Sequence, residues 1–298
     1  MPDNASHLLD DLNVPQRQAV VHAGSPLLVV AGAGSGKTRV LTRRIAYLLA
    51  ERHVSPGEIL AITFTNKAAA EMKERVADIV GPRARVMWVS TFHSACVRIL
   101  RSEATRLGLK QNFSIYDMQD SVRLMTLVAK ELGYDSKTYS AKFLLSQVSN
   151  LKNELIDHET AVDRAQTPNE QVVAEAYGEY QRRLMRASAV DFDDIIGHTV
   201  ALLQAFPDVA EYYHRKFRHV LVDEYQDTNH AQYVLIRELV GDGKDGVEPA
   251  ELCVVGDADQ SIYAFRGANI RNIVEFERDY TNASTVVLEQ NYRSTQNI

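Results

Sequence analysis

The residues with the clearest capacity for chemistry are Gly32, Gly34 and Gly36, which are followed directly by Lys37 and Thr38. Glycines in a turn allow backbone N–H groups to wrap an anion, and the N-terminus of a following helix adds a dipole that favours negative charge. In such a loop the lysine reaches the β- and γ-phosphates of a nucleotide, and the threonine hydroxyl ligates Mg²⁺. The spacing therefore predicts a phosphate-binding loop rather than an ordinary glycine-rich turn.

The predicted loop covers residues 31–38, and both flanks match the motif. An apolar run at residues 27–30 predicts a buried strand before it, and apolar residues at helical spacing follow it. Ala31 stands where the strict pattern has glycine, which leaves the other three glycines in place. The residues expected to contact the nucleotide here are Ala31, Gly32, Ala33, Gly34, Ser35, Gly36, Lys37, Thr38 and Arg39.

Two adjacent carboxylates, Asp223 and Glu224, follow the apolar residues 220–222. In an open α/β sheet, ligands bind beyond the carboxyl ends of the strands, so this pair would face the phosphate-binding loop. Asp223 can then hold Mg²⁺, directly or through water, while Glu224 orients and deprotonates the attacking water. A carboxylate pair after a strand is otherwise often a helix cap, but the loop upstream favours the catalytic interpretation.

A second apolar run, residues 252–255, leads through Gly256 to polar residues that end at Gln260. The neutral amide of Gln260 can donate a hydrogen bond to a γ-phosphate oxygen and accept one from a water. Those properties suit a sensor of the γ-phosphate. An ordinary turn is the alternative for this segment taken alone.

The chain of 298 residues, 45% of them hydrophobic, is long enough for one or two globular domains. Its two cysteines, Cys96 and Cys253, lie far apart in the sequence, which argues against a disulfide or zinc framework. The N-terminus lacks a signal-peptide pattern, and no apolar run reaches membrane-spanning length. The sequence therefore predicts a cytoplasmic protein with no membrane partner.

The net charge of −6 is unevenly distributed along the chain. Residues 31–110 carry 14 Lys and Arg against 6 Asp and Glu, so the rest of the chain is strongly acidic. A basic segment within an acidic protein indicates either a footprint for nucleic-acid phosphates or a solvated helix face.

Apolar runs alternate with helical patterns in two parts of the chain, which predicts an α/β fold with a parallel sheet and right-handed crossovers. Between these parts the pattern is helical throughout. The sequence thus predicts an α/β domain at residues 1–111 and 190–282, with an all-helical domain at residues 112–189 inserted into it.

Six short segments follow one another in the order of the helicase motifs of superfamily 1. They are residues 31–38, 63–69, 90–93, 223–228, 256–268 and 290–294. With these motifs the chain resembles the N-terminal portion of a UvrD/PcrA-type DNA helicase, from about Leu12 to its last residue. The resemblance implies a RecA-like P-loop NTPase domain, 1A, with an inserted all-helical domain, 1B, and it implies ATP and Mg²⁺ as cofactors.

The resemblance also implies roles for residues that match the family's motifs. Gln16 would hydrogen-bond the adenine, Tyr292 would stack on its ring, and Arg293 would reach the γ-phosphate as an arginine finger. The implied catalytic residues are Lys37, Glu224, Gln260 and Arg293. The implied single-stranded DNA track comprises Thr63, Phe64, Asn66, Thr91, Phe92 and His93. The segment that couples nucleotide to DNA would include Tyr263, Phe265 and Arg266.

Aromatic side chains in the DNA track would offer sequence-tolerant stacking for bases, and core packing is the alternative for Phe64 and Phe92. The resemblance implies an ATP-driven helicase that moves 3′ to 5′ on single-stranded DNA and acts at junctions with duplex DNA, in repair or replication. Two alternatives are the motor part of a helicase-nuclease and a P-loop kinase or nucleotide-binding regulator. The Asp-Glu pair, Gln260 and the DNA-track motifs argue against the regulator.

The resemblance assigns residues 283–298 to the start of a second RecA-like domain, with residues 285–288 as its opening strand. A lone strand can neither bury its faces nor pair its backbone. We therefore expect the chain beyond about Asn282 to be loosely held or packed non-natively, with Arg293 away from the phosphate site. This chain alone should then hydrolyse ATP negligibly.

Overall fold

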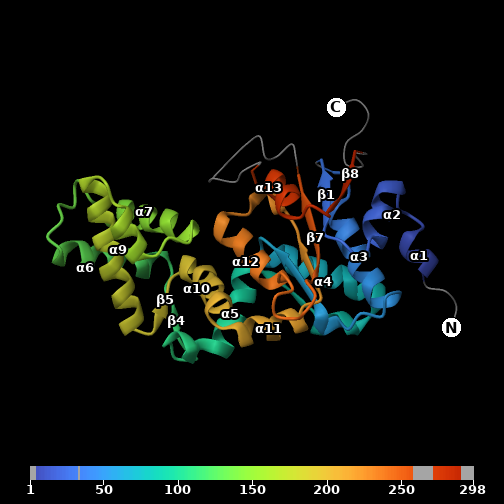
Figure 1. The fold of residues 1–298 in the computed structure, drawn as a ribbon, viewed down its shortest axis with the longest axis horizontal. Helices are drawn as coiled ribbons and strands as arrows, with labels where there is room; N and C mark the ends of the chain where they lie inside the picture. The colour runs from blue at the N-terminus through green and yellow to red at the C-terminus, as the bar shows by residue number, and fades with distance from the viewer. Residues whose placement is uncertain (1–4, 33, 258–270, 290–298) are drawn as a thin grey trace. The chain divides into compact units, whose positions relative to one another are not determined.

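The computed structural model describes residues 5–32, 34–257 and 271–289 (Figure 1). The chain divides into two compact units. The first comprises Met1–Ala95, Phe206–Asn229 and Ile236–Ile298, and the second comprises Cys96–Ala205 and His230–Leu235. The second unit is longer than the helical insertion expected at residues 112–189, in part because α10 (Phe192–Ala205) packs on α7 (Ala141–Asn153).

The first unit is built on a parallel sheet in which six strands are described, in the order β3-β2-β6-β7-β1-β8. Parallel sheets covered on both faces need continuous apolar strands, and the residues of the four central strands are almost all buried. The strands are β1 (Leu27–Ala31), β2 (Ile59–Thr63), β3 (Trp88–Thr91), β6 (His219–Val222), β7 (Glu251–Gly256) and β8 (Ser284–Leu288). The parallel α/β fold predicted from the sequence is confirmed.

Three helices pack together with one face of this sheet: α2 (Val14–Val21), α3 (Lys37–Ala50) and α4 (Asn66–Val80). Their apolar stripes and alternate residues of the strands form one buried cluster. Each large apolar side chain buried in this way contributes about 1.5–3 kcal/mol to folding. This cluster fixes the helices whose N-termini lie beside the carboxyl ends of the strands.

The second unit is mainly helical, but it is not the all-helical domain that the sequence predicts, because β4 (Ser114–Ile115) and β5 (Ala189–Val190) pair as a two-stranded parallel sheet. Lys152, on α7, lies 2.7 Å from Asp191 and 2.8 Å from Asp194, so a buried ion cluster joins α7 to the start of α10. The core of the second unit is formed by apolar residues of α6 (Met118–Glu131), α7 and α9 (Pro168–Arg186). Its other described elements are α5 (Phe92–Glu103, which begins in the first unit), η3 (Ala104–Leu107) and α8 (His158–Arg164).

Short elements complete the description of the first unit. They are α1 (Ala5–Leu9), η1 (Pro56–Glu58), η2 (Pro82–Val86), α11 (Pro207–Lys216), η4 (Tyr225–Asp227) and α13 (Arg271–Asp279). The helix α12 (His230–Val240) contributes residues to both units.

Strand β8 is not loosely held, which was one of the two outcomes expected for the chain beyond about Asn282. It pairs in parallel with β1 at five positions, from Leu27 opposite Ser284 to Ala31 opposite Leu288. The physical reason is that the free edge of β1 satisfies the backbone hydrogen bonds that a lone strand would leave open. In Figure 1, β8 lies beside β1 in the same sheet. The predicted motif at residues 290–294 lies outside the described residues.

Candidate nucleotide-binding site

The predicted phosphate-binding loop connects the carboxyl end of β1 to the first turn of α3. Gly34 and Gly36 have φ angles of 78° and 87°, which is the left-handed region that favours glycine. A Cβ atom on Gly36 would also lie only 2.9 Å from Nε2 of Gln16. The backbone conformation therefore favours glycine at position 36, and a larger residue there would also displace the Gln16 amide.

Gln16 lies against this loop at the start of α2. Its Oε1 accepts a hydrogen bond from the Asn13 amide at 3.2 Å, while the Asn13 side chain accepts one from the Gln16 amide at 2.9 Å. Its Nε2 donates to the Ser35 carbonyl at 3.0 Å. A primary amide has two N–H groups and two oxygen lone pairs, so these bonds leave one donor and one acceptor on this side chain, and the residue is 1% exposed. The structure thus brings Gln16 to the loop.

The loop is braced internally by Ser35, whose hydroxyl donates to the Gly32 carbonyl at 2.8 Å. Thr38 lies in the first turn of α3 and is half-buried. Arg39 is also half-buried, and its Nη2 lies 3.4 Å from Oδ2 of Asp11. Ala31 is the buried last residue of β1, and Ala33 lies outside the described residues.

Lys37 lies between two carboxylates that come from different strands. Its Nζ is 2.8 Å from Oδ2 of Asp257, which follows β7 and is fully buried, and 3.7 Å from Oε2 of Glu224, which follows β6. Gln226 links the Glu224 carboxylate to the backbone after β7, because its Nε2 donates to Oε2 of Glu224 at 2.8 Å and its Oε1 accepts from the backbone N–H of Asp257 at 2.9 Å. Glu224 has a φ of 49°, a strained conformation for a residue with a side chain.

Asp257 and Gln226 belong to this site although neither is among the residues predicted from the sequence. A usable signal was present for Asp257, because it follows the apolar strand β7 just as Asp223 follows β6. In a parallel sheet both positions fall on the edge where ligands bind. No comparable signal identifies Gln226, whose role depends on the turn after Glu224.

Asp223 is a buried carboxylate at the end of β6. Burial, and then the neighbouring charge of Glu224, raise its pKa to about 6. One of its oxygens accepts a hydrogen bond from the Glu224 amide at 3.0 Å, which leaves the other for a cation. Within the described residues no cluster of three or more His, Cys, Asp or Glu could hold a metal by itself. The hydroxyl of Thr38 and the carboxylate of Asp223 are oxygen donors of the kind that Mg²⁺ binds alongside phosphates and waters.

The residues expected in the DNA track gather at the carboxyl ends of β2 and β3, where Thr63 and Thr91 are register partners. Both threonines are buried, and Thr91 accepts a hydrogen bond from the amide of Ser94 at 3.2 Å. Asn66 is exposed at the first position of α4, and His93 is half-buried.

The two aromatic residues of the expected track differ in exposure. Phe64 is half-buried, whereas Phe92 is only 2% exposed. Their ring centroids lie 5.5 Å apart in an edge-to-face arrangement. In this structure Phe92 therefore packs in the interior against Phe64, which is the core-packing alternative, and Phe64 is the ring of the pair with exposed surface.

A cavity of about 970 Å³ lies at the opposite edge of the sheet, where it is lined by Pro26, His214, Glu251 and Tyr280, among others. None of the predicted site residues that the structure describes lines it. None of the helices among the described residues is both long and apolar enough to cross a membrane.

The family model for the UvrD/REP helicase N-terminal domain matches residues 12–281. The chain belongs to the UvrD/REP helicase family. It is 67% identical over 302 residues to the ATP-dependent DNA helicase UvrD1 of Mycobacterium bovis, and 52% identical over 294 residues to the ATP-dependent DNA helicase PcrA of Bacillus subtilis. These matches cover 100% and 99% of this chain, which spans 39% of the length of each relative.

Several residues that the UvrD/PcrA-type motifs single out lie outside the described residues. They are Gln260, Tyr263, Phe265, Arg266, Tyr292 and Arg293. Within the described part, this member of the UvrD/REP family brings together Gln16, the loop, Lys37, Asp223 and Glu224.

Proposed function

We propose that this chain is the ATP-binding part of a DNA helicase that moves 3′ to 5′ along single-stranded DNA and unwinds duplex at single-strand junctions. The observation that carries the proposal is the meeting of Lys37, Glu224 and Asp257 at the loop, at 3.7 and 2.8 Å from the lysine. A carboxylate so close to the lysine that reaches the β- and γ-phosphates lies within reach of a water that attacks the γ-phosphate. This favours hydrolysis over nucleotide binding alone.

In the proposed mechanism, Lys37 exchanges Asp257 for the β- and γ-phosphates when nucleotide binds. Glu224 orients the attacking water and accepts its proton on the carboxylate, while Gln226 keeps that carboxylate in position. Bound Mg²⁺, held by Thr38 and Asp223, would neutralise charge on the phosphates. The left-handed backbone of Glu224 lies directly after β6, and its carboxylate lies 3.7 Å from Lys37.

The motif resemblance supports three further assignments at this site. Gln260 would sense the γ-phosphate, Tyr292 would stack on adenine and Arg293 would stabilise charge in the transition state. The two compact units would correspond to domains 1A and 1B, and the rest of the motor would follow in a longer protein.

DNA would bind at the carboxyl ends of β2 and β3. Phe64 would stack on a base, while the exposed Asn66 and half-buried His93 would contact phosphates. Tyr263, Phe265 and Arg266 would couple this track to the nucleotide. Free, buried thiols at Cys96 and Cys253 support a reducing, cytoplasmic setting, where repair or replication would use the activity.

The test uses the full-length protein. We expect ATP turnover to rise with single-stranded DNA, and a 3′-tailed duplex to be unwound in preference to a 5′-tailed one. Glu224→Gln is the matched control, because it keeps the shape of the side chain but cannot take a proton. ATP binding without DNA-stimulated turnover would favour the nucleotide-binding regulator instead, and preference for the 5′ tail would overturn the polarity.

A further inference from the structure

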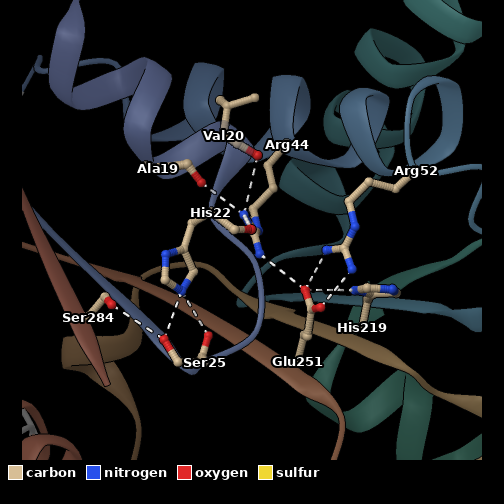
Figure 2. Close-up of polar contacts among 9 residues, drawn as sticks. All are labelled: Ala19, Val20, His22, Ser25, Arg44, Arg52, His219, Glu251 and Ser284. Carbon is tan, nitrogen blue, oxygen red and sulfur yellow. Dashed lines mark hydrogen bonds and ion pairs between the residues drawn. The ribbon is translucent and has the colours of Figure 1, made fainter. Parts of the chain in front are cut away.

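A buried arginine closes the C-terminal end of α2 (Figure 2). Arg44, on α3, is 2% exposed, and its Nη1 donates to the carbonyls of Ala19 at 2.9 Å, Val20 at 3.3 Å and His22 at 2.8 Å. The last carbonyls of a helix have no partner within the helix, so a side-chain donor placed there fixes the position of the helix end.

The guanidinium of Arg44 is itself held by the sheet. Its Nη2 lies 3.7 Å from Glu251, which also forms two hydrogen bonds with Arg52, at 2.6 and 2.7 Å. The Nδ1 atom of His219 lies 3.6 Å from the same carboxylate. Figure 2 shows Arg44, Arg52 and His219 converging on Glu251.

Each element that meets in this cluster carries a residue of the nucleotide site at its other end. The helix α2 carries Gln16 and α3 carries Lys37. Strand β6 begins at His219 and leads to Asp223, and β7 begins at Glu251 and leads to Asp257. The cluster therefore connects, at the edge of the sheet where β6 and β7 begin, the same four elements that carry the residues of the nucleotide site at the opposite edge.

We propose that Arg44 is a positioning residue for recognition of the adenine base. Helix α2 has eight residues and is held at one end by the bond from Gln16 to the Ser35 carbonyl and at the other by Arg44. With both ends fixed to the loop and to α3, Gln16 keeps a constant position relative to the phosphates. The inference rests on the proposed function only for ATP binding and for the contact of Gln16 with the base.

Adenine and guanine differ in the hydrogen-bonding groups that they present to Gln16, and this difference can be used to measure the position of Gln16. A glutamine amide can bond adenine through N6 and N7, whereas guanine presents two acceptors at the corresponding atoms, O6 and N7. A displaced Gln16 would therefore weaken ATP more than GTP. Inorganic tripolyphosphate, which has no base, would be unaffected.

The experiment measures dissociation constants of the full-length protein for ATP, GTP and tripolyphosphate. Arg44→Lys keeps the charge but loses the planar fork that reaches several carbonyls at once. We expect its preference for ATP over GTP to fall by about 2- to 10-fold, the range of one net hydrogen bond, with tripolyphosphate binding unchanged. Arg43→Lys is the matched control, because Arg43 is the neighbouring residue and bonds the His7 carbonyl instead of α2.

Gln16→Ala should lower the preference for ATP by a similar factor, and the double variant with Arg44→Lys should lose no more than Gln16→Ala alone. Full ATP preference in a folded Arg44→Lys, multiplied losses in the double variant, or an unchanged preference in Gln16→Ala would each overturn the inference. If melting shows that Arg44→Lys does not fold, Glu251→Gln, which weakens the hold on Arg44, must lower the same preference. Because the readout is binding, a protein that selects ATP but shows no DNA-stimulated turnover would refute the proposed function and leave this inference standing.

Discussion

The ammonium of Lys37 lies 2.8 Å from Asp257, a carboxylate with no exposed surface, and 3.7 Å from the partly exposed Glu224. The lysine of the loop therefore already has a buried anionic partner. A triphosphate must compete with Asp257 for this cation, and the competition lowers the affinity that the loop would otherwise have.

Asp257→Asn should tighten triphosphate binding, because the amide keeps the shape of the side chain but gives up the ionic bond. A hydrogen bond to a charged group is worth about 1.5–3 kcal/mol, and the amide retains part of it, so we expect roughly a 10-fold lower dissociation constant. Equilibrium titration with ATP measures this. Weaker binding would mean that Asp257 supports the bound nucleotide instead of competing with it.

Glu224→Gln and Lys37→Ala should separate hydrolysis from binding. In the full-length protein, Glu224→Gln should still bind ATP while turnover falls by roughly 10²- to 10⁴-fold, the usual effect of losing a general base. Lys37→Ala should lose both ATP binding and ATP turnover, since it removes the cation that would contact the phosphates. Near-normal turnover in Glu224→Gln would remove Glu224 from the mechanism.

Phe64 and Phe92 should respond differently to substitution by alanine, because Phe64 is half-buried and Phe92 is buried. Phe64→Ala should weaken single-stranded DNA binding by about 1–3 kcal/mol and leave ATP binding intact. Phe92→Ala should instead lower the free energy of unfolding by about 3–5 kcal/mol, because it empties a buried site. DNA titration and chemical unfolding of both variants check this, and a large stability loss in Phe64→Ala would reassign Phe64 to the core.

His219 should make the stability of the protein depend on pH. Burial is the main cause that lowers its pKa from 6.5 to about 4. Between these values the unfolded chain binds more protons than the folded one, so the free energy of unfolding falls as the pH drops from about 6.5 to about 4. In His219→Gln this part of the pH dependence of the free energy of unfolding should vanish. Parallel pH profiles for the variant and the natural protein would contradict the assignment.

The sequence predicted those features that depend on local pattern. The loop at residues 31–38 and the carboxylates after β6 follow from the types and spacing of neighbouring residues. The partner of β8 could not be predicted in this way, because pairing with β1 joins residues more than 250 positions apart. The inward position of Phe92 was likewise hidden, since an aromatic residue at the end of a strand suits both a core and a base. Asp257 occupies a position that the strand pattern marks, but its contact with Lys37 depends on the packing of β7 beside the loop and could not be predicted.

The pairing of β8 with β1 also has a mechanical consequence. The last pair in this register joins Leu288 to Ala31, the residue at which the phosphate-binding loop begins. A pulling force that reaches Leu288 along the strand direction would load the hydrogen bonds of the two strands in shear, so that they resist together instead of breaking one after another. Tension from chain beyond this strand would then be delivered to the strand that carries the nucleotide loop.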